Sequence, residues 1–519
     1  MRFFNTAGPC VAEDHYMLPA SARLPGVRKL IDRKGYFVLH APRQSGKTTT
    51  VLELARELTA GGTYAAVVVS AEVGAPFPDD PGKAERAILD RCRAYAALGL
   101  PDSLRPPPWP DAEEGARIGA ALEAWCQAIP RPLVLFVDEI DALRGPALIS
   151  VLRQLRSGYP ARPGAFPWSL ALIGLRDVRD YKVASGGSES LHTSSPFNIK
   201  VESLTLRSFT AEEVALLYAQ HTAETGQPFT PEALARAFHL TQGQPWLVSA
   251  LARQVVEVVV PDPAVAVTAR HVDEAREILI QRQDTHLDSL AERLREPRVR
   301  RVIEPILAGT SIADVPEDDR RFVVDLGLAR RDAAGRLVIA NPIYQEVIPR
   351  VLAQGTQDSL PAIHPSWLTP QGALDAGRLL EAFLAFWRRH GQPLLSSAPY
   401  HEIAPHLVLM AFLHRVVNGG GTLEREYAIG SGRMDLCLRY GHGDDEVVLA
   451  IELKVWRDGE KDPLSEGLEQ LDGYLSGLGL PGGWLVVFDR RRGVAPIGER
   501  TGATGVTSPG GRAITVIRA

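Results

Sequence analysis

Residues 36–58 read YFVLHAPRQSGKTTTVLELAREL. The stretch opens with an apolar run of strand length, and the loop after it ends in Gly46, Lys47 and Thr48. Apolar side chains then recur at helical spacing through Leu58. A strand, a Gly-Lys-Thr loop and a helix, in this order, are the context that a phosphate-binding loop requires, so we predict such a loop here.

The residue types in this loop fit a nucleoside triphosphate and its magnesium ion. Backbone N–H groups and the helix N-terminus cradle phosphate, Lys47 would reach the β and γ oxygens, and the Thr48 hydroxyl would ligate Mg²⁺. Ala41 replaces the first glycine of the usual pattern, which is tolerable where φ is negative, and Gly46 is retained where backbone meets phosphate. The residues predicted to bind nucleotide in this loop are Pro42, Arg43, Gln44, Ser45, Gly46, Lys47, Thr48 and Thr49.

A second strand supplies the acids that such a site needs. Residues 132–137 are fully apolar, as in a parallel sheet buried on both faces, and they lead into Asp138 and Glu139. We expect Asp138 to hold the water shell of Mg²⁺ and Glu139 to polarise the water that attacks the γ-phosphate. Together the two motifs predict binding and hydrolysis of ATP, with ATP and Mg²⁺ as ligands.

A different chemistry is indicated near the other end of the chain. Residues 432–436 and 447–454 form two apolar runs of strand length, which carry Asp435, Glu452 and Lys454. Alternate residues of a strand share a face, so Glu452 and Lys454 point the same way. Two acids beside a lysine can hold a hard divalent cation and activate water for attack on phosphate. The bland alternative, that these are solvated strand-edge charges, fits less well, because the acids end apolar strands in the order that a nuclease core needs.

Asp435, Glu452-x-Lys454 and the downstream Gln470 resemble the motif set of the PD-(D/E)xK phosphodiesterase superfamily, with Met434 in place of the proline. The resemblance implies an αβββαβ core, a restriction-endonuclease-like fold. It also implies that Asp435 and Glu452 bind Mg²⁺, that Lys454 orients the water or stabilises the pentavalent charge, and that Gln470 supports the site. The expected elements are a helix over 403–417, strands near 423–429, 435–440 and 447–455, a helix over 463–478 and a strand at 484–488.

The N-terminal half resembles the P-loop ATPases of the AAA-like and STAND group, over roughly the first 350 residues. By this resemblance, Arg176 after the strand 169–175 would sense phosphate. The turn 241–246, which contains Gly243-x-Pro245, would lie beside the nucleotide base, with Pro245 in contact with the cofactor. A Gly-x-Pro sequence is also common in ordinary loops, so this alternative stays open.

The chain is therefore expected to be a multidomain α/β protein. Residues 286–353 have the helix and strand–turn–strand pattern of a winged helix, which would bind DNA or, as we favour, act as an internal lever. The predicted divisions are 1–209 for a P-loop ATPase core with a parallel sheet, 210–285 for a helical lid, 286–353 for the winged helix, 354–370 for a linker and 371–519 for the nuclease-like domain.

Composition narrows the functional classes. The 519 residues are 45% hydrophobic and carry a formal net charge of −5, which argues against a generic nucleic-acid coat but not against a nuclease with a local groove. Arginine clusters at 293–301 and 490–492 are explained by charged surfaces, and we assign them no specific role. No apolar run approaches membrane-spanning length, and four scattered cysteines fit a reducing cytoplasm.

These observations predict an ATP-binding and ATP-hydrolysing protein that regulates or drives a C-terminal Mg²⁺-dependent phosphodiester hydrolase. DNA is the expected substrate, and the architecture resembles bacterial defence and mobile-element proteins. A homo-oligomeric ring stays open beside a monomeric switch. The alternative function is that of a STAND-like signalling or scaffold ATPase whose nuclease fold serves as a binding module.

Overall fold

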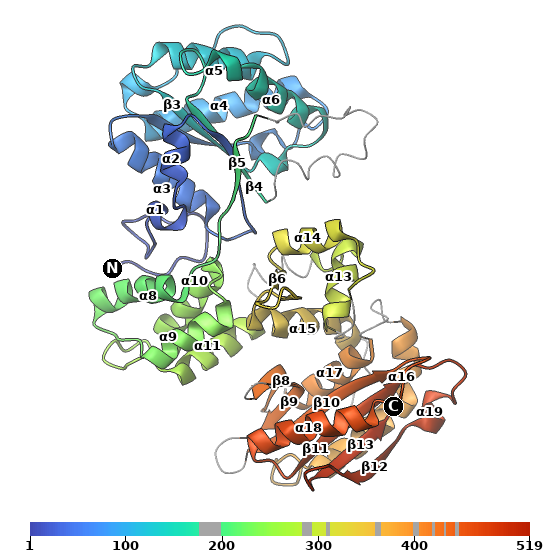
Figure 1. Ribbon diagram of the computed structural model, residues 1–519. Helices are drawn as coiled ribbons and strands as arrows, with labels where there is room; N and C mark the ends of the chain where they lie inside the picture. The colour runs from blue at the N-terminus through green and yellow to red at the C-terminus, as the bar shows by residue number, and fades with distance from the viewer. Residues whose placement is uncertain are drawn as a thin grey trace. The chain divides into compact units, whose positions relative to one another are not determined.

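The computed structural model describes residues 1–175, 199–282, 293–307, 312–358, 365–397, 404–417, 421–429, 432–441 and 446–519. The chain divides into two compact units (Figure 1). Unit 1 comprises Met1–Gln281 with Val324–Gly327, and unit 2 comprises Arg282–Val323 with Leu328–Ala519. Each unit contains a larger β-sheet of its own.

Unit 1 is built on a five-stranded sheet with the strand order β2-β3-β4-β1-β5. All of its neighbouring strands are parallel, which confirms the predicted parallel sheet. The carboxyl ends of parallel strands meet at one edge, so the residues after β1 and after β3 lie on either side of the end of β4. The strands are β1 Tyr36–His40, β2 Ala65–Ser70, β3 Leu133–Asp138, β4 Ser169–Gly174 and β5 Glu202–Thr205.

Helices cover both faces of this sheet, which explains why its central strands are apolar throughout (Figure 1). Tyr36 and Val38 of β1 pack into one hydrophobic cluster with α4, α5 and α6, whereas Phe37 and Leu39 pack into another with α2 and α3. The helices are α1 Ala20–Arg23, α2 Val27–Asp32, α3 Lys47–Ala60, α4 Pro81–Gly99, α5 Arg117–Ala128 and α6 Gly145–Ser157.

A group of helices follows β5 in unit 1, where the sequence predicts a lid. Its first helix starts with a capping box, because the Thr210 hydroxyl accepts from the backbone of Glu213 while the Glu213 carboxylate accepts from the backbone of Thr210. The helices are α8 Ala211–Thr225, α9 Pro231–Thr241, α10 Pro245–Gln254 and α11 Ala269–Arg282.

The described residues in the first part of unit 2 form the helices α13 and α14, a short antiparallel hairpin and the helix α15. This order agrees with the strand–turn–strand expected near residues 328–339, and the winged-helix assignment itself stays a prediction. The last helix continues past the end of the predicted winged helix, so the first residues of the predicted linker are helical. The elements are α13 Pro297–Leu307, α14 Glu317–Asp325, β6 Ala329–Arg331, β7 Leu337–Ile339 and α15 Pro342–Asp358.

The second part of unit 2 is a six-stranded mixed sheet of order β12-β13-β11-β10-β9-β8. The expected helix, three strands, helix and strand occur in that order, as α17, β8, β9, β10, α18 and β11. The sequence reading missed α16, α19, β12 and β13. The elements are α16 Ala376–Ser397, α17 Ala404–Val417, β8 Gly421–Ile429, β9 Gly432–Tyr440, β10 Val447–Trp456, α18 Leu464–Leu478, β11 Gly482–Asp489, α19 Ile497–Arg500, β12 Gly502–Thr507 and β13 Ala513–Arg518.

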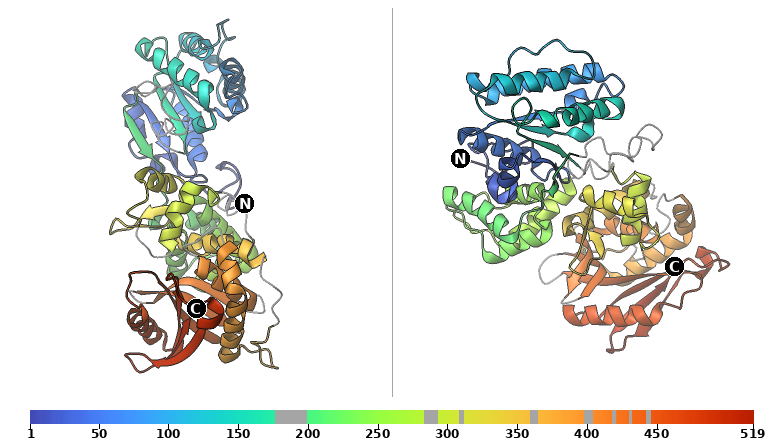
Figure 2. Two further views of the ribbon diagram at one scale, coloured as in Figure 1. Left: turned by 90° about the vertical axis from the view of Figure 1, so that its right-hand side faces the viewer. Right: turned by 45° about the horizontal axis from the view of Figure 1, so that its top comes forward.

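Helices lie on both faces of this second sheet as well (Figure 2). Leu471 and Leu475 of α18 pack against β10 and β11 on one face. On the other face α17 contacts β8, β9, α15 and α16, and nearly all of its side chains are buried. A helix that is apolar on every side is stable only when it is enclosed, so α17 is the central core element of unit 2.

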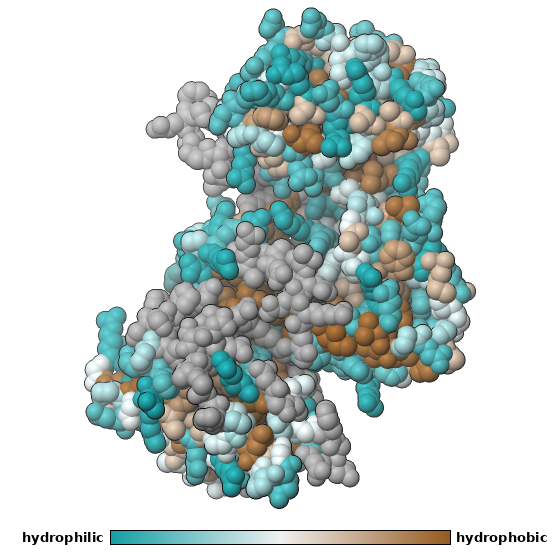
Figure 3. Space-filling view, turned by 180° about the vertical axis from the view of Figure 1, so that it is seen from behind, coloured by the Kyte–Doolittle hydropathy of each residue, from teal (hydrophilic) through white to brown (hydrophobic). Residues whose placement is uncertain are grey.

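Within the described residues, no helix is both long enough and apolar enough to cross a membrane. Polar side chains cover most of the surface seen in the space-filling view, and apolar side chains appear there in small groups (Figure 3).

Phe412 tests the role of α17. It is fully buried and its ring contacts those of Trp367, Phe383 and Phe386. We expect Phe412→Ala to lower the free energy of unfolding of unit 2 by roughly 3–5 kcal/mol, because it leaves a cavity. The measurement is denaturant unfolding, with the exposed Phe3→Ala as the control. An unchanged midpoint for Phe412→Ala would contradict a central role for α17.

Candidate functional site

The predicted phosphate-binding loop connects β1 to α3 in unit 1. Its backbone turns through two left-handed residues, Gln44 with φ 57° and Gly46 with φ 81°, and the Ser45 hydroxyl donates to the Pro42 carbonyl at 2.8 Å. Ala41 is not among the described non-glycine residues with positive φ, so it meets the condition under which alanine is tolerable. The loop thus has the turn that a phosphate-binding backbone needs.

Lys47 points its ammonium group into this loop. Its Nζ donates to the carbonyl oxygens of Ala41 and Pro42, each at 2.8 Å. Burial lowers the pKa of Lys47 to about 8, opposed by the negative charge of Asp138. Phosphate oxygens offer the same group stronger, charged acceptors than the two carbonyls do.

Thr48 and Asp138, both predicted to be magnesium ligands, are in direct contact. The Thr48 hydroxyl donates to Asp138 Oδ2 at 2.7 Å, and the backbone N–H of Glu139 donates to Asp138 Oδ1 at 2.9 Å. Burial raises the pKa of Asp138. A hydroxyl and a carboxylate at this spacing are oxygen donors that suit Mg²⁺, so the residues present fit that ion.

Glu139 follows β3 in a left-handed conformation, with φ 56°. Its carboxylate accepts from the Ser70 hydroxyl at 2.6 Å, at the end of the neighbouring strand β2. The charge of Glu139 raises the pKa of nearby Glu72. Ser70 was not predicted from the sequence, because its partner Glu139 is distant along the chain.

The Gly-x-Pro turn of the lid lies next to the phosphate-binding loop within unit 1. Gln244 caps α10 by accepting from the Leu247 backbone at 2.6 Å, and its Nε2 donates to the Gln44 carbonyl at 3.4 Å. Pro245 is the buried first residue of α10, and its predicted contact with a nucleotide base stays a prediction. The position Arg176 lies outside the described residues.

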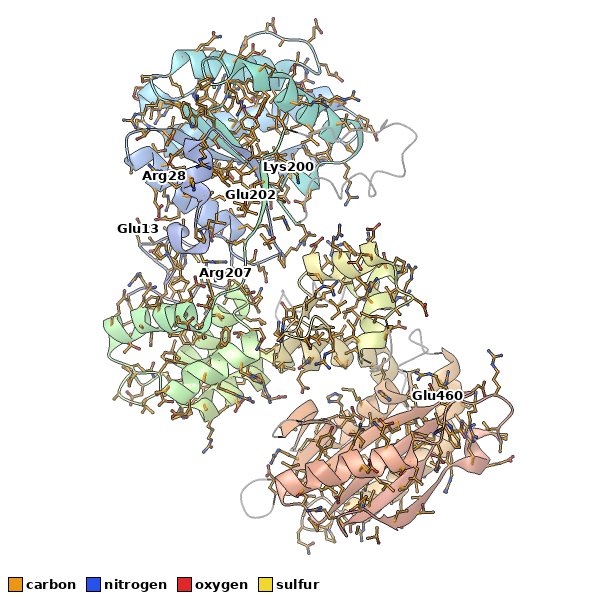
Figure 4. The ribbon with its side chains drawn as sticks, viewed as in Figure 1. Glu13, Arg28, Lys200, Glu202, Arg207 and Glu460 are labelled. Atoms are coloured by element: carbon orange, nitrogen blue, oxygen red, sulfur yellow. The ribbon has the colours of Figure 1, made fainter. Side chains whose placement is uncertain are left out.

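Arg23 is a buried residue of this region that the sequence reading missed. Its guanidinium donates to the carbonyls of Ser45 at 3.2 Å and Arg207 at 2.8 Å, and it lies 4.5 Å from the ring centre of Phe209. Burial lowers the pKa of Arg23 to about 10, opposed by the charge of Glu213. Arg207, labelled in Figure 4, lies between β5 and α8, so Arg23 connects the loop to the segment that leads into the helices α8 to α11.

The N-terminal segment makes a further connection. The backbone N–H of Cys10 donates to the Thr49 hydroxyl at 3.0 Å, and the Trp246 indole donates to the Thr6 carbonyl at 2.8 Å. The segment therefore contacts α3 and the lid helix α10. Arg43, another residue of the phosphate-binding loop, lies close enough to Lys47 for its positive charge to add to the effect of burial in lowering the pKa of Lys47.

The second candidate site is on the sheet of unit 2. The last pair of the antiparallel ladder between β9 and β10 is Leu436 with Ile451. Asp435 and Glu452 are the next residues beyond this pair, one on each strand. The two strands are thus antiparallel neighbours. Asp435 Oδ2 accepts from the backbone N–H of Leu453 at 2.7 Å, so this carboxylate is held at the point where β9 and β10 stop pairing with each other.

The structure brings all four predicted residues of this site together. Lys454 Nζ lies 3.0 Å from Glu452 Oε1 and donates to Gln470 Oε1 on α18. Glu466, one helical turn before Gln470, lies 3.7 Å from the same Nζ and accepts from Gln470 Nε2 at 3.3 Å. Gln470 thus contacts Lys454 from the helix, and its supporting role in a reaction stays a prediction. Glu466 is an additional acid at this site that was not predicted from the sequence.

Glu452 is only 3% exposed. Burial, followed by the charge of Asp435, raises its pKa to about 8. Burial lowers the pKa of Lys454, but the charge and hydrogen bond of Glu452 and the charges of Asp435 and Glu466 together outweigh it, so the net shift is upward. Within the described part of the chain, Glu452 Oε2 is a buried oxygen with no hydrogen-bond partner.

An unpartnered carboxylate oxygen beside a second carboxylate fits a divalent cation. No group of three or more His, Cys, Asp or Glu side chains suited to a metal occurs among the residues that the structure describes. Asp435 and Glu452 would therefore supply two ligands, and water or substrate oxygens the others, which is the usual arrangement for Mg²⁺.

No family model matches the chain, and no curated protein matches it in sequence. Among solved structures, a Walker-type ATPase of Pyrococcus abyssi matches with a TM-score of 0.47 and 12% identity, over 66% of this chain and 99% of that one. The RuvB Holliday junction branch migration motor of Thermotoga maritima matches with a TM-score of 0.34 and 16% identity, over 63% and 92%. The Orc1 protein of Aeropyrum pernix, solved in complex with DNA, matches with a TM-score of 0.36 and 16% identity, over 67% and 95%. Similarities of this strength do not by themselves establish a function.

Glu452 predicts a dependence of stability on pH. Its pKa in the folded protein, about 8, lies above its ordinary value, so its contribution to stability is present at low pH and is lost as pH rises toward 8. In a chelating buffer we expect amide exchange of β10 to accelerate as pH rises, beyond the intrinsic effect of pH, and Glu452→Gln to remove the excess. Mg²⁺ should restore protection at about pH 8 in the wild type only. Equal behaviour of the two proteins would contradict this prediction.

The Gly-x-Pro turn has no room for a side chain at Gly243. An added Cβ would lie 1.9 Å from the Phe209 carbonyl oxygen, and φ is 72°. Gly226 is a matched control, with φ 79° and open space around it. We expect Gly226→Ala to cost roughly 1–2 kcal/mol in unfolding free energy. Gly243→Ala should cost clearly more and also weaken nucleotide binding, measured by denaturation and by titration with a fluorescent ATP analogue.

Proposed function

We propose that this chain binds and hydrolyses ATP in unit 1 and that the nucleotide regulates or drives a phosphodiester hydrolase in unit 2 that acts on DNA. The phosphate-binding loop would hold the triphosphate through its backbone N–H groups and Lys47. Thr48 and Asp138 would hold Mg²⁺, which neutralises charge on the phosphate oxygens. Glu139 would orient the attacking water once its carboxylate leaves the Ser70 hydroxyl.

Glu452 carries the hydrolase part of the proposal. The Glu452 carboxylate is buried, one of its oxygens has no partner, and it lies next to Asp435 and to a lysine that contacts α18. Burying such a group lowers the stability of the fold, so a purely structural role would not favour it. With Asp435 it would hold the cation, whose role is to polarise the phosphoryl oxygens. Lys454 would orient the water. The water would give up a proton to solvent as its oxygen bonds to phosphorus, the bond from phosphorus to the leaving sugar oxygen would break, and that oxygen would take up a proton from solvent.

Regulation by ATP requires that the nucleotide favour one state of the protein over another. Arg23 and Gln244 connect the phosphate-binding loop to the lid through hydrogen bonds to Ser45 and Gln44. A bound triphosphate that shifts this loop would therefore change the lid. The alternative function, a signalling or scaffold ATPase with an inactive nuclease fold, is less well supported, because an inactive site has no need to keep both carboxylates and an oriented lysine.

The decisive test compares Glu452→Gln, Lys47→Ala and a control, Glu469→Gln, which alters an exposed acid of α18. We expect Glu452→Gln to lower Mg²⁺-dependent DNA cleavage by about 10²-fold or more while ATP hydrolysis is unchanged. Lys47→Ala should abolish ATP binding and alter cleavage, and Glu469→Gln should change neither. Cleavage is measured on linear and circular DNA with and without ATP. Full cleavage by Glu452→Gln, or ATPase activity without any cleavage, would favour the alternative function.

A further inference from the structure

One edge of the unit 2 sheet gathers arginines around a tryptophan. The strands β10, β11 and β13 are parallel, so their carboxyl ends meet at this edge. Trp456 pairs with Asp489 in the last register of β10 and β11, and the backbone N–H of Arg490 donates to the Trp456 carbonyl at 2.8 Å. The loop that follows β10 contains Glu460, whose position marks this edge in Figure 4.

This edge is close to the candidate hydrolase site. Glu452, Lys454 and Trp456 alternate along β10 and therefore share one face of the sheet. Trp456 lies two residues beyond Lys454, which is about 6.6 Å along the strand. A nucleic-acid strand has one phosphate per roughly 3.4 Å of helix axis, so a strand held at Lys454 has its next phosphates within reach of this edge.

Two arginine guanidinium groups lie against the Trp456 ring, and each of them is paired with an aspartate. The Arg491 guanidinium lies 3.4 Å from the Trp456 ring centre, and Asp489 binds it through two hydrogen bonds of 2.9 and 2.8 Å. Arg518 lies 5.3 Å from the same ring and is paired with Asp462 at 2.6 Å. The ring is thus covered by guanidinium groups and fixes the loop that follows β11.

The neighbouring arginines of that loop keep their charge available. Arg490 is exposed, and no ion pair involving it is found within the described residues. The Arg492 side chain is 96% exposed and lies 3.7 Å from Asp458, a contact too open to neutralise it. The backbone N–H of Arg492 donates to Asp458 Oδ1 at 3.0 Å, so the loop is anchored through its backbone while the side chains of Arg490 and Arg492 remain exposed.

We propose that Arg490 and Arg492, held in place by the Trp456–Arg491 stack, bind the phosphate backbone of the DNA strand that leaves the hydrolase site. This inference rests on the proposed hydrolase function. A planar guanidinium binds phosphate through two parallel hydrogen bonds, and two such groups on an anchored loop bind adjacent phosphates without reading bases. In a chain with a net charge of −5, the exposed guanidinium groups of Arg490 and Arg492 would attract the phosphates of the substrate to this edge of the site.

The test measures DNA binding by the full chain with Arg490→Ala and Arg492→Ala combined. The probe is a fluorescein-labelled DNA duplex in chelating buffer, followed by anisotropy over a range of salt concentrations. We expect a rise in Kd of about tenfold and a fall of about two in the slope of log Kd against log salt. The control combines Arg91→Ala and Arg93→Ala, two exposed arginines of α4, which removes the same charge and should leave Kd unchanged.

Kinetics separate this site from the hydrolase itself. In Mg²⁺, the Arg490→Ala and Arg492→Ala variant should raise KM with kcat nearly unchanged, whereas Glu452→Gln lowers kcat. Two outcomes would overturn the proposed binding site but not the hydrolase. In the first, the α4 control weakens DNA binding as much as the Arg490→Ala and Arg492→Ala variant does. In the second, that variant has an unchanged Kd while the wild type cleaves DNA. DNA binding that depends on Arg490 and Arg492 in a protein that never cleaves would support the site and overturn the hydrolase. The single Arg490→Ala variant leaves the anchored loop intact, so a loss of binding there is not a loss of folding.

Discussion

Both candidate sites depend on the difficulty of placing a carboxylate inside a protein. A buried carboxylate is stable only where hydrogen bonds or positive charge compensate for its lost hydration. In unit 1 Asp138 ends β3 and accepts from the Glu139 backbone and the Thr48 hydroxyl. In unit 2 Asp435 lies just past the end of a ladder and accepts from the Leu453 backbone. The end of β3 in unit 1, and the point within β9 and β10 where these two strands stop pairing in unit 2, leave backbone N–H groups that donate to these carboxylates.

Glu452 is an acid whose lost hydration is only partly compensated. Lys454 neutralises one oxygen, and the other has no partner in the described structure. The raised pKa of Glu452 expresses the same imbalance, because protonation is the means of relief that the protein itself offers. A divalent cation between Glu452 and Asp435 would relieve it more fully. Stability and metal binding are therefore linked at this position.

Local sequence patterns were sufficient to predict those parts of the fold in which a strand, a loop and a functional residue follow one another closely in the chain. The loop before Lys47, the acids after β3 and the strands around Glu452 could all be predicted, because apolar runs and the residues that end them lie close together in the chain. Arg23, Ser70 and Gln244 could not, since each acts through a partner that is distant in sequence. The strands β12 and β13 were missed because they follow a long polar segment without a motif. The resemblance to a nuclease core extended only as far as β11.

The enclosed helix α17 has a consequence for how unit 2 is made. All of the strands that cover it, β8 and β9 included, come later in the chain, whereas α15 and α16 come earlier. During synthesis an apolar helix with no polar face therefore leaves the ribosome before its sheet exists, and α15 and α16 are the neighbours at hand to shield it. We therefore expect α15 and α16 to shield α17 from aggregation until the sheet has formed.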